Sequence, residues 1–410
     1  MPSTLPDGEP VPADGGLPPA ALAGAAERPL AFYLHVPYCA TRCGYCDFNT
    51  YTAGELRGSG GVLASRENYA EVIAEEIRLA RKVLGDDPRR VSTVFFGGGT
   101  PTLLPPADLE RMLDAVRQEF GLAEDAEVTT EANPESVDAA SLAALREAGF
   151  TRISFGMQSA RPHVLAVLER RHTPGRPEAC VAEARAAGFA HVSLDLIYGT
   201  PGESDADWRA SLAAAIGAGP DHVSAYSLIV EEGTRLARRV RRGEIPPTDE
   251  DVNADRYLIA EEELTAAGFG WYEISNWAAS PADRCRHNEL YWRGADWWGA
   301  GPGAHSHVGG VRWWNVKHPG AYAQALAQGR SPGAGREVLT EEDRRVERIM
   351  LELRLAEGCE TGLLRERGLA AARRAAADGL LDARALAAGR AVLTLRGRLL
   401  ADALTRDLVD

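Results

Sequence analysis

Short apolar runs alternate with amphipathic stretches along the first two-thirds of the chain. The runs are rich in β-branched and aromatic residues and occur at 31–36, 91–96, 126–131, 151–156, 190–197 and 222–229. Between and after them, apolar residues recur at helical spacing, most clearly at 67–84, 107–119, 138–148, 177–187, 205–217 and 250–267. Because strands that alternate with helices build βα units around a parallel sheet, the pattern predicts an α/β fold. Six such units are too few for a complete eight-stranded barrel, so we expect a partial (β/α)6 barrel.

The rest of the chain divides into three further segments. Residues 1–28 are rich in Pro, Ala and Gly without an apolar period, which predicts a disordered tail before a barrel that spans 29–270. Residues 271–335 form an aromatic and glycine-rich extension that holds seven of the eight tryptophans. In residues 336–410, two helical patterns at 341–356 and 361–377 precede a β-like run at 391–395 and a last stretch at 398–408. This pattern predicts a winged-helix-like α+β domain with a packing or interaction role.

Charge and cysteine content narrow the class of protein. The 410 residues include 45 basic and 59 acidic side chains, a net charge of −14, which argues against a binder of nucleic acid or anionic membranes. No apolar run approaches the ~18 residues that span a bilayer. The first residues lack the basic and apolar regions of a secretory signal, and a disulfide scaffold would be shorter and denser in cysteine. We therefore expect a cytoplasmic protein with reduced thiols.

Three of the six cysteines lie within eight residues, just after the first predicted strand. Cys39, Cys43 and Cys46 have the spacing C-x3-C-x2-C. Three thiolates on one tight loop can hold three irons of a cubane cluster, and because such clusters usually take four cysteines, one iron would keep an open position. Two alternatives stand beside this interpretation: a zinc site completed by a histidine such as His35, or three buried thiols.

A glycine-rich motif, Gly97-Gly98-Gly99-Thr100-Pro101, follows the second predicted strand. Glycines let a ligand approach the backbone closely, and exposed amide and carbonyl groups there can bind the ends of a small zwitterion. Carboxyl ends of neighbouring parallel strands meet at one rim, so we expect this motif beside the cysteine loop. A simple tight turn is the alternative.

The two motifs resemble those of the radical S-adenosylmethionine superfamily. From about residue 30 to 408 the chain is similar to the branch that contains oxygen-independent coproporphyrinogen III oxidases and HemW-type haem chaperones. The resemblance implies a [4Fe–4S] cluster on the three loop cysteines, with its open iron chelated by the methionyl end of S-adenosylmethionine. It also implies contacts to that nucleoside, carried over by position, from Tyr33, Tyr45, Gly98, Gly99, Thr100, Glu131, Gln158, Arg170 and Asp195.

Several of these residues also stand out by their position alone. Glu131, Gln158 and Asp195 each follow an apolar run, so they would project from strand ends into one cavity. Arg170 lies in the less regular stretch after the fourth strand. Any one of them taken singly could be a helix cap or a surface residue, but together they predict one site.

Within the branch, three features resemble the haem chaperones rather than the oxidases. The oxidase loop has a further cysteine two residues after the third, and here that position is Phe48. The long amino-terminal segment that helps the oxidase hold its substrate has no counterpart before Ala31. The run His287-Asn-Glu-Leu-Tyr291-Trp292 matches the His-Asn-x-x-Tyr-Trp signature of the chaperones.

The resemblance therefore implies binding of haem as cargo and its transfer to client haemoproteins, respiratory ones among them. His287 would be an axial ligand, with Tyr291 and Trp292 covering the macrocycle, since neutral imidazoles ligate haem iron and aromatic faces suit a porphyrin. Rival ligands are His305, His307 and Cys285, and an aromatic core beneath a loop is the structural alternative. Whether S-adenosylmethionine is cleaved, and whether the chain forms a homodimer, stay open.

Two other functions remain as alternatives. One is an oxygen-independent coproporphyrinogen III oxidase, which would decarboxylate two propionates by radical chemistry. The other is an interaction protein that carries zinc and a winged-helix tail. Metal analysis separates the second from the other two, because it predicts zinc and no labile sulfide.

Overall fold

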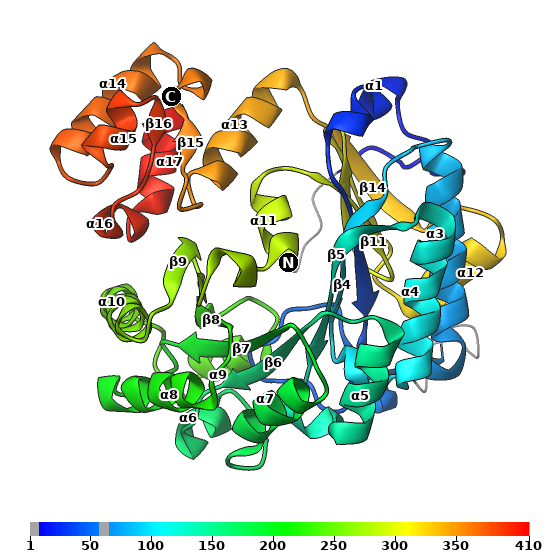
Figure 1. The fold of residues 1–410 in the computed structure, drawn as a ribbon, viewed down its shortest axis with the longest axis horizontal. Coiled ribbons are helices and arrows are strands. Elements are labelled where there is room, and N and C mark those ends of the chain that lie inside the picture. Colours follow the sequence, from blue (N-terminus) through cyan, green and yellow to red (C-terminus); the bar gives the residue numbers. More distant parts are fainter. Residues whose placement is uncertain (1–7, 57–64, 410) are drawn as a thin grey trace.

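The computed structural model describes residues 8–56 and 65–409, and its centre is the partial barrel that the sequence predicts (Figure 1). Six neighbouring parallel strands form it, in chain order: β1 (Leu30–Val36), β4 (Val91–Gly98), β5 (Leu122–Ala132), β6 (Arg152–Gln158), β7 (His191–Tyr198) and β8 (His222–Ser227). The connecting helices cover the outer side of the sheet: α3 (Tyr69–Leu84), α4 (Pro106–Phe120), α5 (Ala139–Ala148), α7 (Arg176–Ala186), α8 (Asp205–Ala218) and α10 (Glu250–Ala266). The expected α/β fold is confirmed.

Burial and capping explain why these residues form these elements. Leu30, Phe32, Leu34 and Val36 of β1 are fully buried, and because alternate strand residues share a face, they form one apolar face of the strand. Helix α8 begins at a capping box in which Ser204 Oγ accepts the Asp207 N–H, while the Asp207 carboxylate accepts the Ser204 N–H.

The aromatic extension does not form a unit apart from the barrel, because its strands continue the same twelve-stranded sheet at both edges. On one side β11 (Asp296–Ala300) pairs parallel with β1. Antiparallel neighbours follow it: β12 (His305–Val308), β13 (Val311–Asn315) and β14 (Gly333–Val338). On the other side β10 (Asn276–Ala278) pairs with β8 and with β9 (Gly270–Glu273). The extension thus widens the barrel wall.

The expectation of a disordered tail is wrong for residues 8–28, and residues 1–7 lie outside the described residues. This segment includes α1 (Pro19–Leu22), and Glu9 pairs with Arg336 of β14 through backbone hydrogen bonds of 2.9 Å. The Arg28 guanidinium donates to the carbonyls of Ala21 and Ala23 and to the buried Asp296 carboxylate. Tertiary contacts order a segment that has no apolar period of its own.

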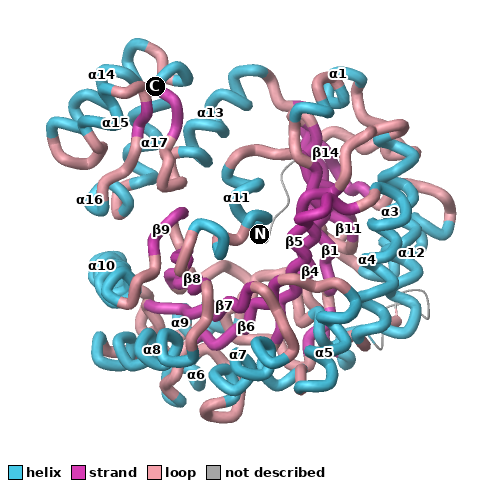
Figure 2. Tube along the Cα trace, viewed as in Figure 1, coloured by secondary structure: helices cyan, strands magenta, loops and turns pink. Residues whose placement is uncertain are grey.

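The carboxy-terminal residues form a separate hydrophobic core of mainly helical segments (Figure 2). Helix α13 (Glu341–Glu352) leads from the barrel into it. The other elements are β15 (Cys359–Glu360), α14 (Glu366–Ala377), α15 (Ala383–Ala387), β16 (Arg390–Ala391), α16 (Leu395–Arg398) and α17 (Ala401–Val409). The unit contains helices and a short two-stranded sheet, the two kinds of secondary structure that the sequence predicts. Its winged-helix-like topology stays a prediction. Across residues 8–56 and 65–409, no helix combines the length and apolarity needed to cross a membrane.

A buried carboxylate at Glu76 strengthens the attachment of the extension to the barrel. Glu76 of α3 is fully buried and accepts hydrogen bonds from Gly301 N–H (2.8 Å), Asn315 Nδ2 (2.8 Å), Trp298 Nε1 (3.4 Å) and the Tyr322 hydroxyl. Burial raises the pKa of Glu76 to about 7, although these donors favour the ionised form. The cluster ties α3 to strands β11 and β13 and to α12 (Pro319–Ala327).

We expect Glu76→Ala to lower the free energy of unfolding by about 3 kcal/mol, because it leaves several buried donors unpaired. The isosteric Glu76→Gln is the matched control and should cost less. Since the pKa of Glu76 lies at about 7 in the folded protein against 4.5 unfolded, its stabilising effect is complete below 4.5 and is lost as pH rises to about 7. Denaturant unfolding of the wild type and Glu76→Gln at about pH 5 and about pH 8 measures this, and an unchanged difference between them would contradict it.

Candidate functional site

The carboxyl ends of the parallel strands surround one cavity of about 960 Å³. All residues that the sequence assigns to the cluster and to the nucleoside line it: Cys39, Cys43, Cys46, Tyr33, Tyr45, Gly98, Gly99, Thr100, Glu131, Gln158, Arg170 and Asp195. They come from β1, β4, β5, β6 and β7 and from the loops that follow these strands. The structure thus brings together residues that are as much as 162 positions apart (Tyr33 to Asp195).

The cysteine loop is fixed by its neighbours on both sides. Strand β2 (Tyr38–Cys39) pairs with β3 (Tyr51–Thr52) and so closes the loop on itself. At the middle of the loop, Gly44 N–H donates to the Leu168 carbonyl (3.0 Å) and the Gly44 carbonyl accepts from Leu236 N–H (2.7 Å). Arg170 Nη1 lies 3.6 Å from Cys43 Sγ. This contact places a positively charged side chain beside one of the three expected cluster ligands.

The glycine motif packs against the cysteine segment as well as against the cavity. Gly99 N–H donates to the Val36 carbonyl and Thr100 N–H to the Tyr38 carbonyl, both at 2.8 Å. Gly98 has φ +108°, and a Cβ there would lie 2.5 Å from the His35 ring; one at Gly99 would lie 2.5 Å from the Tyr38 carbonyl oxygen. Glycine is therefore required here for the approach of the two loops, in addition to any ligand.

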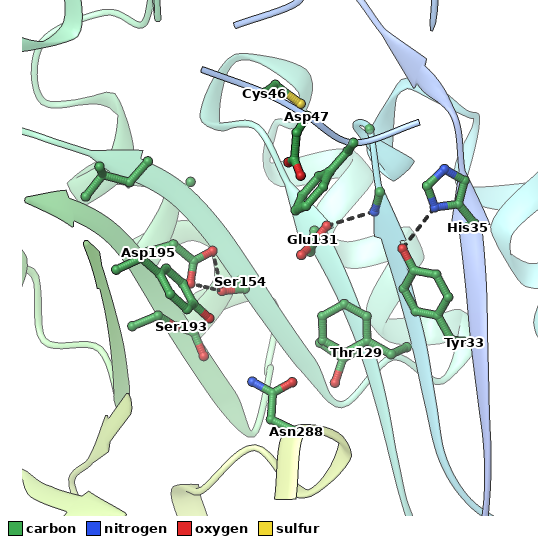
Figure 3. Close-up of a pocket in the computed structure, with 18 of the residues that line it drawn as sticks. Tyr33, His35, Cys46, Asp47, Thr129, Glu131, Ser154, Ser193, Asp195 and Asn288 are labelled. Atoms are coloured by element: carbon green, nitrogen blue, oxygen red, sulfur yellow. Dashed lines mark hydrogen bonds between the residues drawn. The ribbon is translucent and has the colours of Figure 1, made fainter. Parts of the chain in front are cut away.

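Two half-buried carboxylates that line the cavity give it its electrostatic character (Figure 3). Glu131 Oε2 accepts the Gly98 N–H (3.1 Å), and Ser154 Oγ lies 3.0 Å from both oxygens of Asp195. Desolvation, with repulsion from Asp195, raises the pKa of Glu131 to about 8, and desolvation also raises the pKa of Asp195. A ligand that brings positive charge between these groups would restore their ionised forms. The sulfonium and ammonium groups of S-adenosylmethionine have that charge.

Unsatisfied polar atoms on the lining residues indicate that the cavity is built for a polar ligand. Gln158, in the left-handed region at φ 59°, leaves Oε1 buried without a hydrogen-bond partner. Thr129 Oγ1 and Arg170 Nε are also buried and unpartnered, although Arg170 Nη2 donates to the Gly156 carbonyl. Buried polar groups are rarely left unpaired unless a ligand or water completes them. The lining residues fit the nucleoside because they offer it unpaired hydrogen-bonding atoms.

The geometry does not favour the zinc alternative. His35 Nε2 donates to the Asn49 carbonyl (2.9 Å) and Nδ1 accepts from the Tyr33 hydroxyl (3.0 Å), so neither nitrogen is free to ligate. Within the described part of the chain, one group has three ligand atoms close enough for a single ion: His191, Asp221 and Asp283. It lies apart from the cysteines, and its members already pair with one another or with neighbouring groups such as Arg185.

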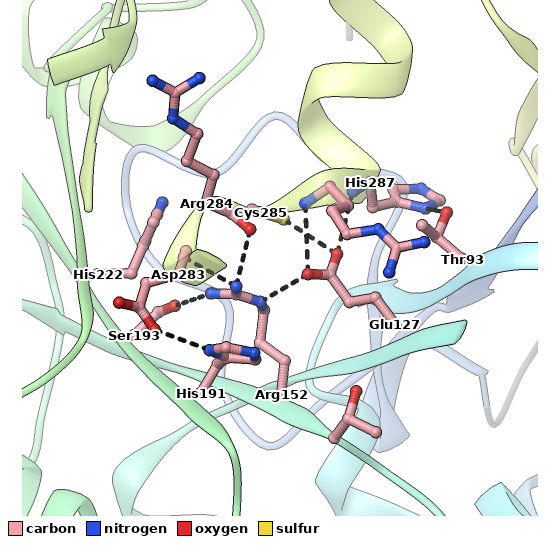
Figure 4. A network of polar contacts seen from close by, with 12 residues as sticks. Thr93, Glu127, Arg152, His191, Ser193, His222, Asp283, Arg284, Cys285 and His287 are labelled. Carbon is pink, nitrogen blue, oxygen red and sulfur yellow. Dashed lines mark hydrogen bonds and ion pairs between the residues drawn. The ribbon is translucent and has the colours of Figure 1, made fainter. Parts of the chain in front are cut away.

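The His-Asn-x-x-Tyr-Trp motif occupies α11 (Arg286–Trp292), whose first turn joins a network of polar contacts with the barrel strands (Figure 4). His287 is 1% exposed and does not line the cavity. Its Nδ1 bonds to Thr93 Oγ1 (2.7 Å) and its Nε2 to the Tyr291 hydroxyl (2.8 Å). The expected role of His287 as an axial ligand is therefore not supported, because both ring nitrogens are engaged within the protein. Tyr291 lines the cavity, whereas Trp292 does not.

Comparison with known proteins agrees with this geometry. The profile of the radical SAM superfamily matches residues 33–215. The haem chaperone HemW of Mycobacterium tuberculosis is 53% identical over 388 residues, which cover 95% of this chain and 97% of the relative. This chain belongs to the HemW family of radical S-adenosylmethionine proteins. The HemW protein of Synechocystis is 37% identical over 82% of this chain and 80% of its own length.

The fold also has a solved counterpart. The coproporphyrinogen III oxidase HemN of Escherichia coli superposes with a TM-score of 0.79 over 95% of this chain and 92% of its own length, at 23% identity. At that identity the likeness establishes the HemN-like fold alone. The much higher identity to HemW proteins places the chain with the chaperone branch that Phe48 and the α11 motif indicate.

Motif analysis missed the polar interior of this HemW-family barrel. Glu127 accepts hydrogen bonds from Arg152 Nε and His287 N–H, both at 3.0 Å, and so holds α11 against the strands. The signal was available in the sequence, because polar residues alternate with apolar ones in strands that should be apolar on both faces. The alternating set that lines the cavity comprises Thr129 and Glu131, Arg152 and Ser154, Ser193 and Asp195, and His222, Ser224 and Tyr226.

We expect Gly98→Ala to lower the free energy of unfolding by about 2 kcal/mol, because the residue has a positive φ and its Cβ would collide with His35. The matched control is Gly217→Ala, since Gly217 lies within α8 with nothing within 4 Å of its Cβ position. Alanine there should be neutral or stabilising by about 0.5–1 kcal/mol. Thermal unfolding of both variants measures the contrast, and equal effects would refute the packing role of Gly98.

Proposed function

We propose that the chain binds haem and delivers it to client haemoproteins, and that it carries a [4Fe–4S] cluster with S-adenosylmethionine in the strand-end cavity. The observation that carries the proposal is the 53% identity to a HemW haem chaperone over 95% of the chain, joined to a cavity lined by every residue assigned to the cluster and to the nucleoside. The names of relatives support haem as the cargo.

Within this proposal the residues have distinct tasks. Cys39, Cys43 and Cys46 would each hold one iron, which leaves one iron open for a ligand. The three cysteines do not form a group close enough for one ion, which suits the wider spacing of ligands around a multi-iron cluster. Such a cluster, held by these cysteines, would supply reducing electrons next to the bound nucleoside.

The remaining lining residues bind and orient the nucleoside. The backbone of Gly98, Gly99 and Thr100 would face its amino-acid end, while Glu131 and Asp195 supply the negative charge that its cationic groups require. Arg170 bridges the site, because it contacts both Cys43 and the Gly156 carbonyl. Tyr45, whose side chain is half buried, packs against the apolar cluster that includes Leu168 and Leu236.

Haem suits the apolar parts of the same cavity. Large apolar side chains remain exposed on its lining, with exposed fractions of 46% for Phe48, 65% for Ile229, 41% for Tyr226 and 37% for Met350. Exposed apolar groups that converge on a cavity are typical of binding sites for apolar ligands. Client haemoproteins and a homodimer remain proposals that rest on the resemblance.

The decisive experiment separates the chaperone from the oxidase. We expect anaerobic, cluster-loaded protein to show saturable, stoichiometric haem binding by absorbance. Supplied with coproporphyrinogen III, S-adenosylmethionine and a reductant, it should form no decarboxylated product. Product without specific haem binding would identify an oxidase and overturn the proposal. Haem release to an apo-haemoprotein, followed by its absorbance, then tests transfer.

Replacement of Cys39, Cys43 and Cys46 by Ala should abolish bound iron, labile sulfide and the visible absorbance of the cluster. The matched control is Cys180→Ala, since Cys180 is buried in α7 and does not line the cavity. Iron and sulfide analysis after anaerobic reconstitution measures the difference. Cluster iron that persists in the triple variant would refute the assignment, and one equivalent of zinc without sulfide in the wild type would favour the zinc protein.

A further inference from the structure

We infer that His307 of β12, through its Nε2 atom, is the axial ligand that the chain offers to haem iron. The inference rests on the proposed haem binding and assigns it to a residue outside the α11 motif. It follows from a comparison of the four histidines that line the cavity, His35, His222, His305 and His307.

Three of these histidines are unsuited to iron. His35 uses both ring nitrogens, for the Tyr33 hydroxyl and the Asn49 carbonyl. His222 bonds through Nε2 to the Tyr272 hydroxyl (2.8 Å), and its Nδ1 is enclosed by protein. The Nε2 of His305 is likewise enclosed, so the iron of a rigid porphyrin could reach it only if the surrounding side chains moved. A porphyrin, being a wide rigid disc, can bring its iron only to a nitrogen that faces open space.

His307 has the arrangement that ligating histidines usually have. Its Nδ1–H donates to the Ala295 carbonyl at 2.9 Å, which fixes the tautomer and leaves the lone pair on Nε2. Among residues 8–56 and 65–409, Nε2 has no hydrogen-bond partner, and it is not one of the fully enclosed nitrogens. Burial lowers the pKa of His307, so the imidazole stays neutral, as coordination requires.

The surroundings of His307 suit a porphyrin. Trp297 lies beside the imidazole, with ring centroids 5.1 Å apart, and also lines the cavity. Met350 and Leu351 of α13 line the cavity too and offer an apolar face. Arg312, the cross-strand neighbour of His307, lines the same cavity, and its guanidinium is held by the carboxylates of Glu337 and Glu347.

Coordination adds one bond, from the Nε2 lone pair to iron, with no change in redox state. The test is a titration of the cluster-loaded protein with ferric haem and, in parallel, with iron-free protoporphyrin IX. We expect His307→Ala to weaken haem binding at least tenfold and to change the spectrum of the bound haem, while protoporphyrin binding stays as in the wild type. Added imidazole should restore the wild-type spectrum in His307→Gly.

Two controls keep the outcomes distinct. His163→Ala removes an exposed histidine of α6 (Pro162–Val167) and should change neither titration. His307→Gln keeps a polar side chain of similar size and should lose the haem spectrum in the same way, which guards against a folding defect in the alanine variant. If the wild type binds haem and the His307 variants keep its affinity and spectrum, the inference is wrong. If the wild type binds no haem, the proposed function itself fails.

Discussion

Two backbone hydrogen bonds join the glycine motif to the segment that leads into the cysteine loop. They run from Gly99 to Val36 and from Thr100 to Tyr38, and they join the end of β4 to the segment that carries the first cysteine. Only glycines allow the loops this close, because a Cβ at Gly98 or Gly99 would collide with the neighbouring segment. The position of the cysteine loop over the strand ends, and with it the shape of the cavity, depends on this contact.

The barrel interior is polar where a parallel sheet would ordinarily be apolar, and its buried charges have different roles. Glu127 and Arg152 neutralise each other and fix α11, so they act in the structure of the site. Among the described residues neither Glu131 nor Asp195 forms an ion pair, and desolvation raises the pKa of both, although the charge of Arg170 partly opposes the rise at Asp195. Glu127 and Arg152 are paired, whereas Glu131 and Asp195 are not. This contrast indicates that the part of the cavity beside Glu131 and Asp195 is the place for a cationic ligand.

The α11 motif and the start of the carboxy-terminal segment both contribute residues to the cavity lining. His287 stacks on Phe95 and bonds to Thr93, so the motif braces the interior and presents Tyr291 to the cavity. Helix α13 brings Met350 and Leu351 to the same space before the chain enters its second core. The imidazole of the signature residue His287 thus bonds within the protein, whereas the Nε2 that is neither bonded nor fully enclosed among the described residues belongs to the largely buried His307 of β12.

Local patterns were sufficient for the six βα units, for the cysteine and glycine motifs and for the strand-end position of Glu131 and Asp195, because periodicity and chain order determine which residues end a parallel strand. Local patterns were insufficient where contacts between distant segments determine the structure. Residues 8–28 are ordered by Arg28 and Asp296, and the extension joins both edges of the sheet. Whether a histidine is available to a ligand depends on which groups surround its two nitrogens. Tertiary packing alone therefore separated His287, which bonds through both ring nitrogens, from His307, whose Nε2 has no hydrogen-bond partner in the described part of the chain.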